Sequence, residues 1–405
     1  MPDTIEKTDP GIVSPEELVQ RAQSLVPMIR DRQAQTESDR RVSAELFGAI
    51  RDQEIFKILL PRRYGGFEHG LDTFAEVGIE IARGCGSVGW VNSVTAMYHV
   101  FLGMYPEQAQ DDVWGEDPGA VVAASFTPTG TVTAVDGGYS LSGKWMFCSG
   151  VDNCSWTIVG VTVPPDKDGD PEGKAYALAR TADFGMEDNW NVVGLAGTGS
   201  KNVMCEDMFI PEHRLLPIED TMTGKPPGAA VNDGPLYRIP LFAAMSCSLV
   251  APIIGMAQGA IDEFLDLTKG RVTRGAALSK PAPMAALPGI QLKLGEAMAA
   301  VDSARLLVDR DLKDIMATVS AGKELTMQQR ARNKGDWGYA ARLSVQAVDA
   351  IFAASGGGGL FRSGRIQRYW RDAHAGSAHI SMNWDAVGAL YGRVTLGLPP
   401  GPAQF

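Results

Sequence analysis

The chain has 405 residues, 45% of them hydrophobic, so it can bury a large core and would ordinarily divide into two or three domains. Its net charge of -11 and pI near 5.0, with no run of Lys or Arg, argue against a surface for phosphate backbones, and nucleic acid is not an expected partner. The acidic N-terminus does not resemble a secretory signal, and we see no uninterrupted apolar stretch of about 20 residues, so we predict a cytoplasmic protein without membrane contact.

The cysteines are scattered and form no CxxC pair. Their odd number and irregular spacing are typical of thiols that stay reduced, so we predict neither a disulfide framework nor a metal site. They are Cys85, Cys148, Cys154, Cys205 and Cys247.

The first predicted domain, residues 12–118, is helical. Ser14 followed by Glu17 is typical of a capping box at a helix start. Apolar residues then recur at helical spacing until Pro61 interrupts the pattern.

The second predicted domain, residues 119–222, is a small antiparallel β domain. Short β-branched runs such as TVTAV and WTIVGVTV are separated by clusters of Gly, Pro, Asp and Asn, including the DGG of residues 136–138.

The third predicted domain, residues 235–400, follows a link rich in Pro and Gly. Ala, Leu, Arg and Gln dominate it, which favours a four-helix bundle with breaks near residues 280–288, 321–322 and 356–359. The predicted fold class is therefore α+β and mostly α, in the order helices, β domain, helical bundle.

Four short motifs share this chain order with one superfamily. They are PRRYGG at 61–66, GKWMFCSG at 143–150, GLAGTGS at 194–200 and WRDA at 370–373. They resemble, respectively, the "P..yGG" turn, the flavin-contacting strand, the "GlrGtgS" segment and the "yRDa" element of the acyl-CoA dehydrogenases. The resemblance covers about residues 40–397 and implies the acyl-CoA dehydrogenase-like fold.

The residues after the WRDA motif argue against a dehydrogenase. In much of that family a Glu shortly after "yRDa" abstracts the proton α to the thioester. Aligning the RD pairs without a gap places Ile380 at that position, and a hydrocarbon side chain cannot take a proton. A dehydrogenase with its Glu on another helix stays as the alternative function, and a non-catalytic flavin- or ligand-binding protein is a third.

The segment instead contains a histidine, His379, in a "WRDaha.s.H" pattern. This pattern resembles the group D flavin monooxygenases, which include hydroxylases of p-hydroxyphenylacetate-like and steroid-derived phenols. Residues 86–91, 125–130 and 147–156 resemble segments of the same group.

This second resemblance implies the oxygenase component of a two-component monooxygenase. A separate reductase would supply reduced flavin, and reaction with O₂ would hydroxylate a small, aromatic substrate through a C4a-hydroperoxyflavin. We predict reduced FMN as the cofactor, with FAD as the alternative.

Three residues are predicted to be catalytic within this resemblance. His379 can deprotonate a phenol or protonate a departing oxygen, and its alternative is a surface histidine that caps a helix. His99 lies in an apolar aromatic stretch, where a buried structural histidine is equally expected. Ser149 is expected to donate to flavin N5 or O4, with Cys148 as a weaker donor and a turn-forming serine as the alternative.

The remaining predictions concern the cofactor and the assembly. The resemblance implies that guanidinium groups and a glycine turn bind flavin phosphate, and that the glycine turn approaches the phosphate of a neighbouring subunit. We interpret Arg371 and Asp372 as an ion pair that fixes the helix carrying His379. Apolar faces at 290–308 and 340–351 favour a homotetramer. The predicted flavin contacts are Ser125, Phe147, Cys148, Ser149, Arg271, Arg274, Gly357 and Gly358.

Overall fold

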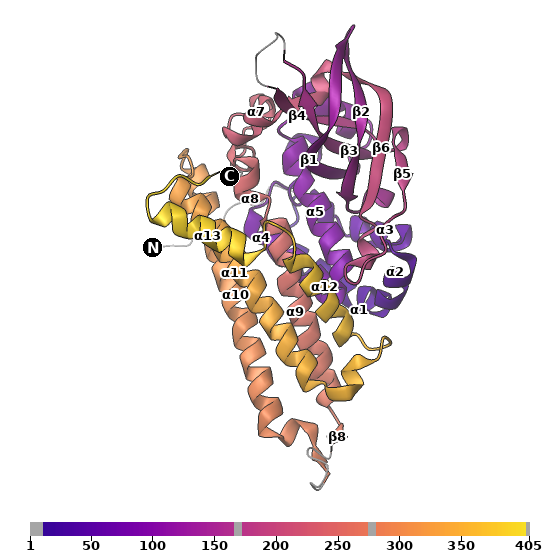
Figure 1. The fold of residues 1–405 in the computed structure, drawn as a ribbon, viewed down its shortest axis with the longest axis vertical. Helices are drawn as coiled ribbons and strands as arrows, with labels where there is room; N and C mark the ends of the chain where they lie inside the picture. The colour runs from indigo at the N-terminus through magenta and orange to yellow at the C-terminus, as the bar shows by residue number, and fades with distance from the viewer. Residues whose placement is uncertain (1–10, 166–171, 274–280, 402–405) are drawn as a thin grey trace.

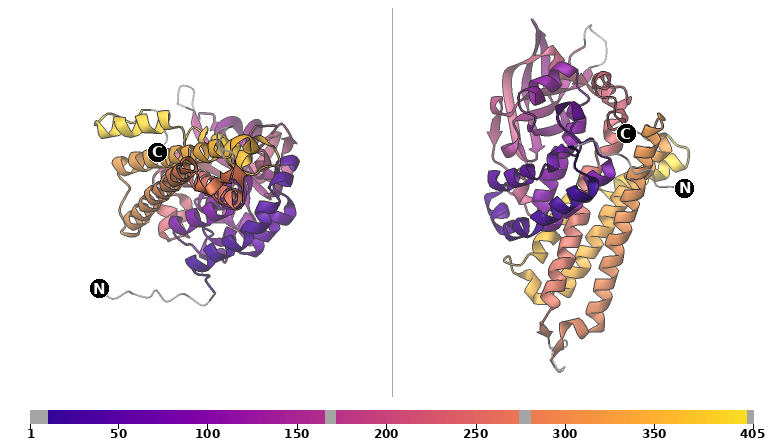
Figure 2. Two further views of the ribbon diagram at one scale, coloured as in Figure 1. Left: turned by 90° about the horizontal axis from the view of Figure 1, so that it is seen from below. Right: turned by 180° about the vertical axis from the view of Figure 1, so that it is seen from behind.

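The computed structural model describes residues 11–165, 172–273 and 281–401. The sheet occupies one end of an elongated molecule and the long helices of the C-terminal bundle extend to the other end (Figure 1). Seen from behind, the N-terminal helices lie beneath the sheet and beside the bundle (Figure 2).

The N-terminal part is helical, as predicted. Its first helix begins after Ser14, whose Oγ accepts a hydrogen bond from the Glu17 N–H at 3.2 Å. A short π-helical turn, Asp111–Gly115, ends the region. The helices are α1 (Pro15–Asp31), α2 (Gln33–Asp39), α3 (Ala44–Asp52), α4 (Leu71–Gly84), α5 (Gly86–Leu102) and α6 (Glu107–Gln110).

Helix α5 is the structural centre of the molecule. All of its 17 residues are buried, because α4, α9, α12 and the first strand of the sheet pack around it. A helix enclosed in this way needs no charged face, which explains why its sequence contains no Asp, Glu, Lys or Arg.

The sheet has the strand order β5-β6-β2-β1-β3-β4-β7. It is mixed, which corrects the prediction of an antiparallel domain, since β1 and β3 pair in parallel. The β1–β2 hairpin returns the chain to the end where β1 began, so β3 starts beside the start of β1 and runs in the same direction. The strands are β1 (Val122–Val135), β2 (Gly138–Cys148), β3 (Trp156–Val163), β4 (Gly173–Arg180), β5 (Gly185–Glu187), β6 (Lys201–Pro211) and β7 (Leu215–Pro217).

The C-terminal part is a bundle of long helices, interrupted where the sequence predicted breaks. Two short helices, α7 (Ile218–Met222) and α8 (Leu241–Ala244), lead into it, and a two-stranded ribbon lies at its far end (Figure 1). The bundle elements are α9 (Cys247–Thr268), β8 (Val272–Thr273), β9 (Ala282–Pro283), α10 (Pro288–Ser320), α11 (Met327–Ala354), α12 (Ile366–Ser377) and α13 (Trp384–Thr395).

One segment of the bundle is apolar enough to span a membrane by length and composition, contrary to the sequence prediction. This segment, Leu241–Thr268, comprises α8 and α9, and 89% of its most apolar window is buried inside the protein. Helix α9 packs against α4, α5, α11 and α12. Its composition is therefore explained by a position in the core.

Candidate active site

The end of β2 is joined to the GTGS segment. The Gly150 N–H donates to the carbonyl oxygen of Thr198 at 2.9 Å. The hydroxyl oxygens of Ser149 and Ser200 lie 2.7 Å apart, and the Ser200 hydroxyl is 2.7 Å from that of Thr198. Two motifs that resemble flavin-binding segments thus form one continuous structure.

An apolar ledge lies directly before Ser149. Phe147 adopts a left-handed backbone conformation, with φ of 62°, and its side chain is 62% exposed. A bulky residue is rarely found in this conformation, which costs on the order of 1–3 kcal/mol and is concentrated at functional sites. Met146 is also exposed, and Trp190 meets the Phe147 ring edge-on at 5.8 Å. We call Met146, Phe147 and Trp190 the ledge.

The two predicted hydrogen-bond donors at the end of β2 differ in their surroundings. Cys148 is fully buried, and burial raises the pKa of its thiol to about 12. Ser149 is partly exposed beside the ledge. Ser125, a predicted flavin contact, stabilises the backbone of the ledge, since its hydroxyl donates to the Met146 carbonyl at 2.8 Å. Ser149 is therefore the polar side chain that the end of β2 offers to a ligand.

Helix α12 is held in place by the RD pair, but in a different way from the predicted ion pair. Asp372 is buried and accepts a hydrogen bond from the Leu195 N–H at 2.7 Å. Arg371 pairs with Glu37 at 2.5 Å and donates to the Val193 carbonyl at 2.6 Å. Each residue thus ties α12 to another element, and the two do not neutralise each other in a direct contact. Burial raises the pKa of Asp372 to about 6.

His379 lies in the turn that follows α12. Its Nδ1 accepts a hydrogen bond from the Ser381 N–H at 3.2 Å, so the proton of the neutral ring is assigned to Nε2. Desolvation by the surrounding protein lowers the pKa of His379, and the positive charge of Lys334 lowers it further. More than a third of the residue's surface is still accessible, so the ring is open to solvent on one side. His379 is thus held as a neutral donor.

A single turn of α5 lies against both the end of β2 and His379. Trp90 lies 6.4 Å from the His379 ring, centroid to centroid. A Cβ atom placed on Gly376 would approach Trp90 to 3.1 Å, and one on Gly150 would approach Val91 to 2.8 Å. The same turn of α5 therefore contacts both Gly150, the residue after Ser149, and His379.

His99 is placed elsewhere. It lies nine residues after Trp90 on α5, which corresponds to about 14 Å along the helix. Its Nδ1–H donates to the Phe56 carbonyl at 2.8 Å, and its ring meets Trp114 edge-on. Burial lowers the pKa of His99 to about 4. These contacts are those of a structural histidine, the alternative that the sequence left open.

The predicted phosphate-binding elements meet at the far end of the bundle. Arg271 donates to the Ser355 carbonyl at 3.3 Å, and a Cβ atom on Gly358 would lie 3.3 Å from its Nη2. Gly357 and Gly358 are both exposed. Arg274 lies outside the described residues.

This end of the bundle is far from His379 in the same chain. Ile253 of α9 lies beside Gly376, and the fifteen residues from Ile253 to Thr268 rise about 23 Å along the helix before Arg271 is reached. In Figure 1, β8 and the sheet lie at opposite ends of the molecule.

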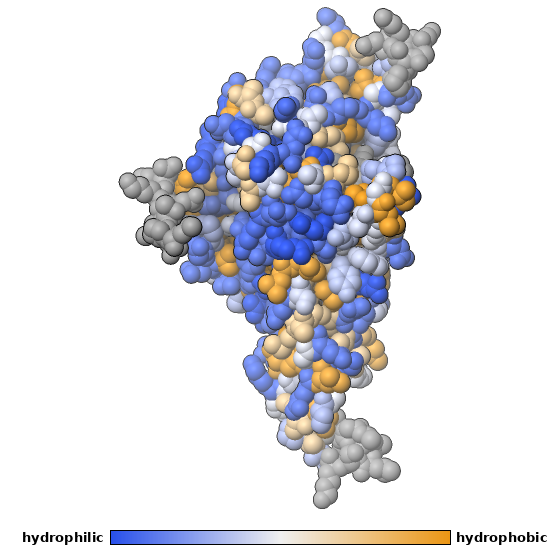
Figure 3. Space-filling view, turned by 90° about the vertical axis from the view of Figure 1, so that its left-hand side faces the viewer, coloured by the Kyte–Doolittle hydropathy of each residue, from blue (hydrophilic) through white to orange (hydrophobic). Residues whose placement is uncertain are grey.

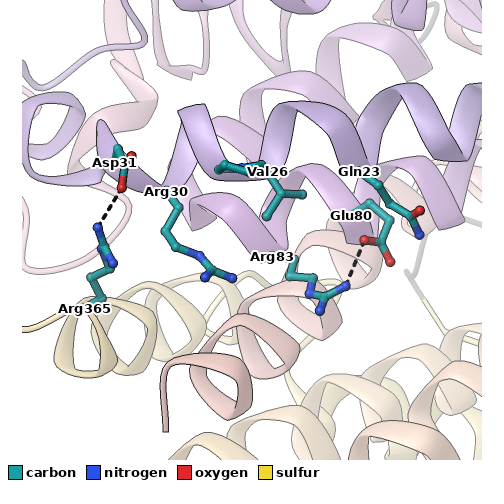
Figure 4. A pocket seen from close by; sticks show the side chains of 8 residues that line it. Gln23, Val26, Arg30, Asp31, Glu80, Arg83 and Arg365 are labelled. Carbon is teal, nitrogen blue, oxygen red and sulfur yellow. Dashed lines mark hydrogen bonds and ion pairs between the residues drawn. The ribbon is translucent and has the colours of Figure 1, made fainter. Parts of the chain in front are cut away.

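A charged hollow of about 500 Å³ lies apart from these residues, between α1, α4 and the start of α12 (Figure 4). Its arginines have partners, as Arg365 binds Asp31 at 2.9 Å and Arg83 binds Glu80 at 3.3 Å. Arg365 and His379 flank opposite ends of α12, about 18 Å of helix. The hollow is therefore not part of the site around α5.

Sequence reasoning did not single out Trp90, Thr198 or Ser200. Thr198 and Ser200 are the two polar residues of the GTGS motif, and the motif alone does not indicate a separate role for either. Trp90 lies in the segment 86–91 that carried the monooxygenase resemblance, but nothing in that pattern distinguishes a site residue from a core residue.

The fold and this arrangement of β2, GTGS segment and α12 turn define an acyl-CoA dehydrogenase-like flavoprotein. The family model "Acyl-CoA dehydrogenase, C-terminal domain" matches residues 247–384. The "FADH(2)-dependent resorcinol hydroxylase, oxygenase component" of Rhizobium sp. is 39% identical, covering 95% of each chain.

Solved structures show the same relationship. The HsaA monooxygenase from M. tuberculosis matches with a TM-score of 0.89 at 34% identity, over 96% of this chain and 99% of that one. XiaF from Streptomyces sp., in complex with FADH2 and glycerol, matches with a TM-score of 0.88 at 29% identity, over 96% and 98%. The chain belongs to the family of oxygenase components of flavin-dependent two-component monooxygenases. This confirms the predicted fold class and enzyme class, and the dehydrogenase alternative is not favoured.

Proposed function

We propose that this enzyme holds the ring of a reduced flavin on the ledge of β2 and a small phenol between that ring and His379. The observation that carries the proposal is that one turn of α5 contacts both Gly150, which follows Ser149, and His379, although the two come from different parts of the chain. The ledge fits a planar ring, because an exposed aromatic side chain lies beside a partly exposed hydroxyl.

Each residue has a distinct task in this arrangement. Bound reduced flavin supplies the reaction with O₂ that the protein itself cannot perform. Phe147 and Trp90 exclude water from the reacting groups, and Ser149 contacts the polar edge of the ring. His379 donates its Nε2–H to the oxygen of the substrate or of the departing group, and its lowered pKa keeps it neutral at pH 7.

The substrate class follows from the relatives. The Rhizobium relative is named for resorcinol, and a more distant one, 27% identical, for p-hydroxyphenylacetate. We infer a small phenol and a separate flavin reductase as partner. The test is to supply dihydroflavin and O₂ with a panel of phenols and to measure hydroxylated product per O₂ consumed. A ratio near zero for every phenol would refute the substrate class.

We infer FAD as the working cofactor. The names of the Rhizobium relative and of the XiaF complex both specify FADH2, which favours FAD over the FMN predicted from sequence. Anaerobic titration with both reduced flavins measures the preference, and tighter binding of reduced FMN would restore the sequence prediction.

We also propose that the enzyme is a homotetramer whose flavin sites include residues of two chains. Leu292, Met298 and Leu306 are exposed along α10, and the bundle end of the surface shows apolar patches (Figure 3). Arg271 lies too far from the ledge of its own chain to bind the same ring, so its phosphate partner would belong to a neighbour. Light scattering that shows a monomer at micromolar concentration would overturn the assembly.

We infer the place of the protein in the cell from its helices and charge. The buried α9 and the net charge of -11 support the proposal of a soluble, cytoplasmic enzyme. Fractionation of the source cells that recovers the protein in the membrane pellet would contradict it.

A further inference from the structure

A row of three hydroxyl groups connects Ser149 to the protein interior. Ser149 Oγ lies 2.7 Å from Ser200 Oγ, which lies 2.7 Å from Thr198 Oγ1, which lies 2.8 Å from the carbonyl oxygen of Leu195. Thr198 is 1% exposed and Ser200 is 3% exposed. The row therefore has one inner end at a backbone carbonyl and one outer end beside the ledge.

The direction of the hydrogen bonds in this row follows from the inner end. A carbonyl oxygen can only accept, and a hydroxyl has a single proton to donate. Thr198 therefore donates to Leu195, which requires Ser200 to donate to Thr198 and Ser149 to donate to Ser200. In the opposite direction, the 2.8 Å contact between Thr198 and Leu195 would hold no proton and would bring two lone pairs together.

The outer end is then left without a proton. The O–H of Ser149 points toward Ser200 in a hydrogen bond. The side of the Ser149 oxygen that faces the ledge therefore carries only lone pairs. Ser149 is a hydrogen-bond acceptor toward any ligand, which reverses the donor role predicted from sequence.

We propose that Thr198 and Ser200 are positioning residues that hold Ser149 as an acceptor and so make the site selective for reduced over oxidised flavin. The ring nitrogen N5 carries a hydrogen in reduced flavin and a lone pair in oxidised flavin. An acceptor oxygen attracts the first form and repels the second. This inference rests on the proposed function, in which Ser149 faces the polar edge of the ring.

The selectivity suits an enzyme that receives its flavin reduced. A ligand shifts an equilibrium only by its differential affinity for two states, and here the two states are the redox forms of the ligand. One correctly directed hydrogen bond is sufficient for about a tenfold preference.

The test is anaerobic equilibrium binding of reduced and oxidised FAD to the full-length protein. In Ser200→Ala the Ser149 hydroxyl loses its acceptor, so it can rotate and donate a hydrogen bond to N5 of oxidised flavin. We expect the ratio of the two dissociation constants to fall about tenfold, mainly through tighter binding of oxidised FAD. Thr198→Val should lower the ratio likewise, because Ser200 can then donate to Ser149. Thr198→Ser keeps the hydroxyl and should preserve the ratio.

A matched control removes a buried hydroxyl elsewhere. Thr157 of β3 shares a 2.9 Å hydroxyl contact with Thr181, outside the row, so Thr157→Val should leave the ratio unchanged. Thermal melting of each variant identifies those that are folded. One folded variant, either Ser200→Ala or Thr198→Val, is sufficient to test the ratio of the dissociation constants.

The variant Ser149→Ala separates the two levels of the proposal. If it leaves both dissociation constants unchanged, Ser149 does not face the flavin, and the proposed site itself fails. If it changes the ratio while Ser200→Ala and Thr198→Val weaken both redox forms equally, the row has only a structural role and the selectivity proposal is overturned.

Discussion

Asp372 of α12 accepts a hydrogen bond from the backbone N–H of Leu195 at 2.7 Å, in a fully enclosed position. The contact joins the helix that precedes His379 to the segment that leads to Thr198 and Ser200. Together with the bond from Arg371 to the Val193 carbonyl, this carboxylate holds the two halves of the site in register, although 177 residues separate it from Leu195.

We predict that Asp372→Ala destabilises the protein and misaligns the site. The change leaves the buried Leu195 N–H without an acceptor, which costs about 1–3 kcal/mol. Product per O₂ should fall as His379 moves relative to the ledge. Denaturant unfolding and a coupling assay measure the two effects. Asp372→Asn, which keeps an acceptor oxygen, is the control and should retain most of the coupling.

Acid stability should depend on His99. Its pKa of about 4 in the folded state lies below the ordinary value near 6.5, so the unfolded chain binds the proton more readily. The stability that this group contributes is present above pH 6.5 and is lost as the pH falls toward 4, by about 1.4 kcal/mol per unit.

The variant His99→Asn isolates this effect, since its amide can still donate to Phe56. We expect the free energy of unfolding of the wild type, measured relative to that of the variant, to decrease between pH 6.5 and 4. Asp372 acts in the opposite direction, because its raised pKa lets the folded state bind a proton first, and it contributes equally to both proteins. Parallel pH curves for wild type and variant would show that His99 is not shifted.

Ser149→Ala should leave the fold intact and increase the share of O₂ that is released as hydrogen peroxide. The hydroxyl contact at the ring edge is lost, whereas the backbone bond from Gly150 to Thr198 is kept. Ser149→Thr retains a hydroxyl and should have a milder effect. Peroxide release is measured with a peroxidase-coupled assay, and unchanged coupling in the alanine variant would place the contact on a backbone group instead.

Arg271→Ala should weaken flavin binding several-fold without changing the product per O₂, because the guanidinium fork suits phosphate and lies far from the reacting groups. Titration with reduced FAD and with a reduced flavin that lacks phosphate separates the two contributions. A loss of affinity for the phosphate-free flavin that is as large as the loss for FAD would contradict a phosphate role.

The sequence predicted the elements of the site better than their connections. The end of β2 and the turn after α12 were singled out as parts of the candidate site because short motifs mark them. The contact between Ser149 and Ser200 spans 51 residues and depends on an irregular register between β2 and β6, which no local pattern encodes. The parallel pairing of β1 and β3 was not predicted for the same reason, because the alternation of apolar and polar residues in a strand does not indicate the direction of its neighbours.

The two histidines illustrate a different limit. His99 and His379 are both chemically able to transfer protons, and the aromatic stretch around His99 suits a pocket as well as a core. Only the complete burial of α5 and the bond to Phe56 distinguish them. The structure also assigns the proton of neutral His379 to Nε2 through the contact with Ser381, which residue type alone does not determine.

The most direct test of the account is the fate of oxygen in His379→Ala. The variant should still bind reduced flavin and consume O₂, because neither step needs the His379 donor. Product should fall by roughly 10² to 10⁴-fold, with the missing oxygen recovered as hydrogen peroxide, and His379→Asn should fall in between because it keeps a donor. Full, coupled hydroxylation by His379→Ala would contradict the central claim.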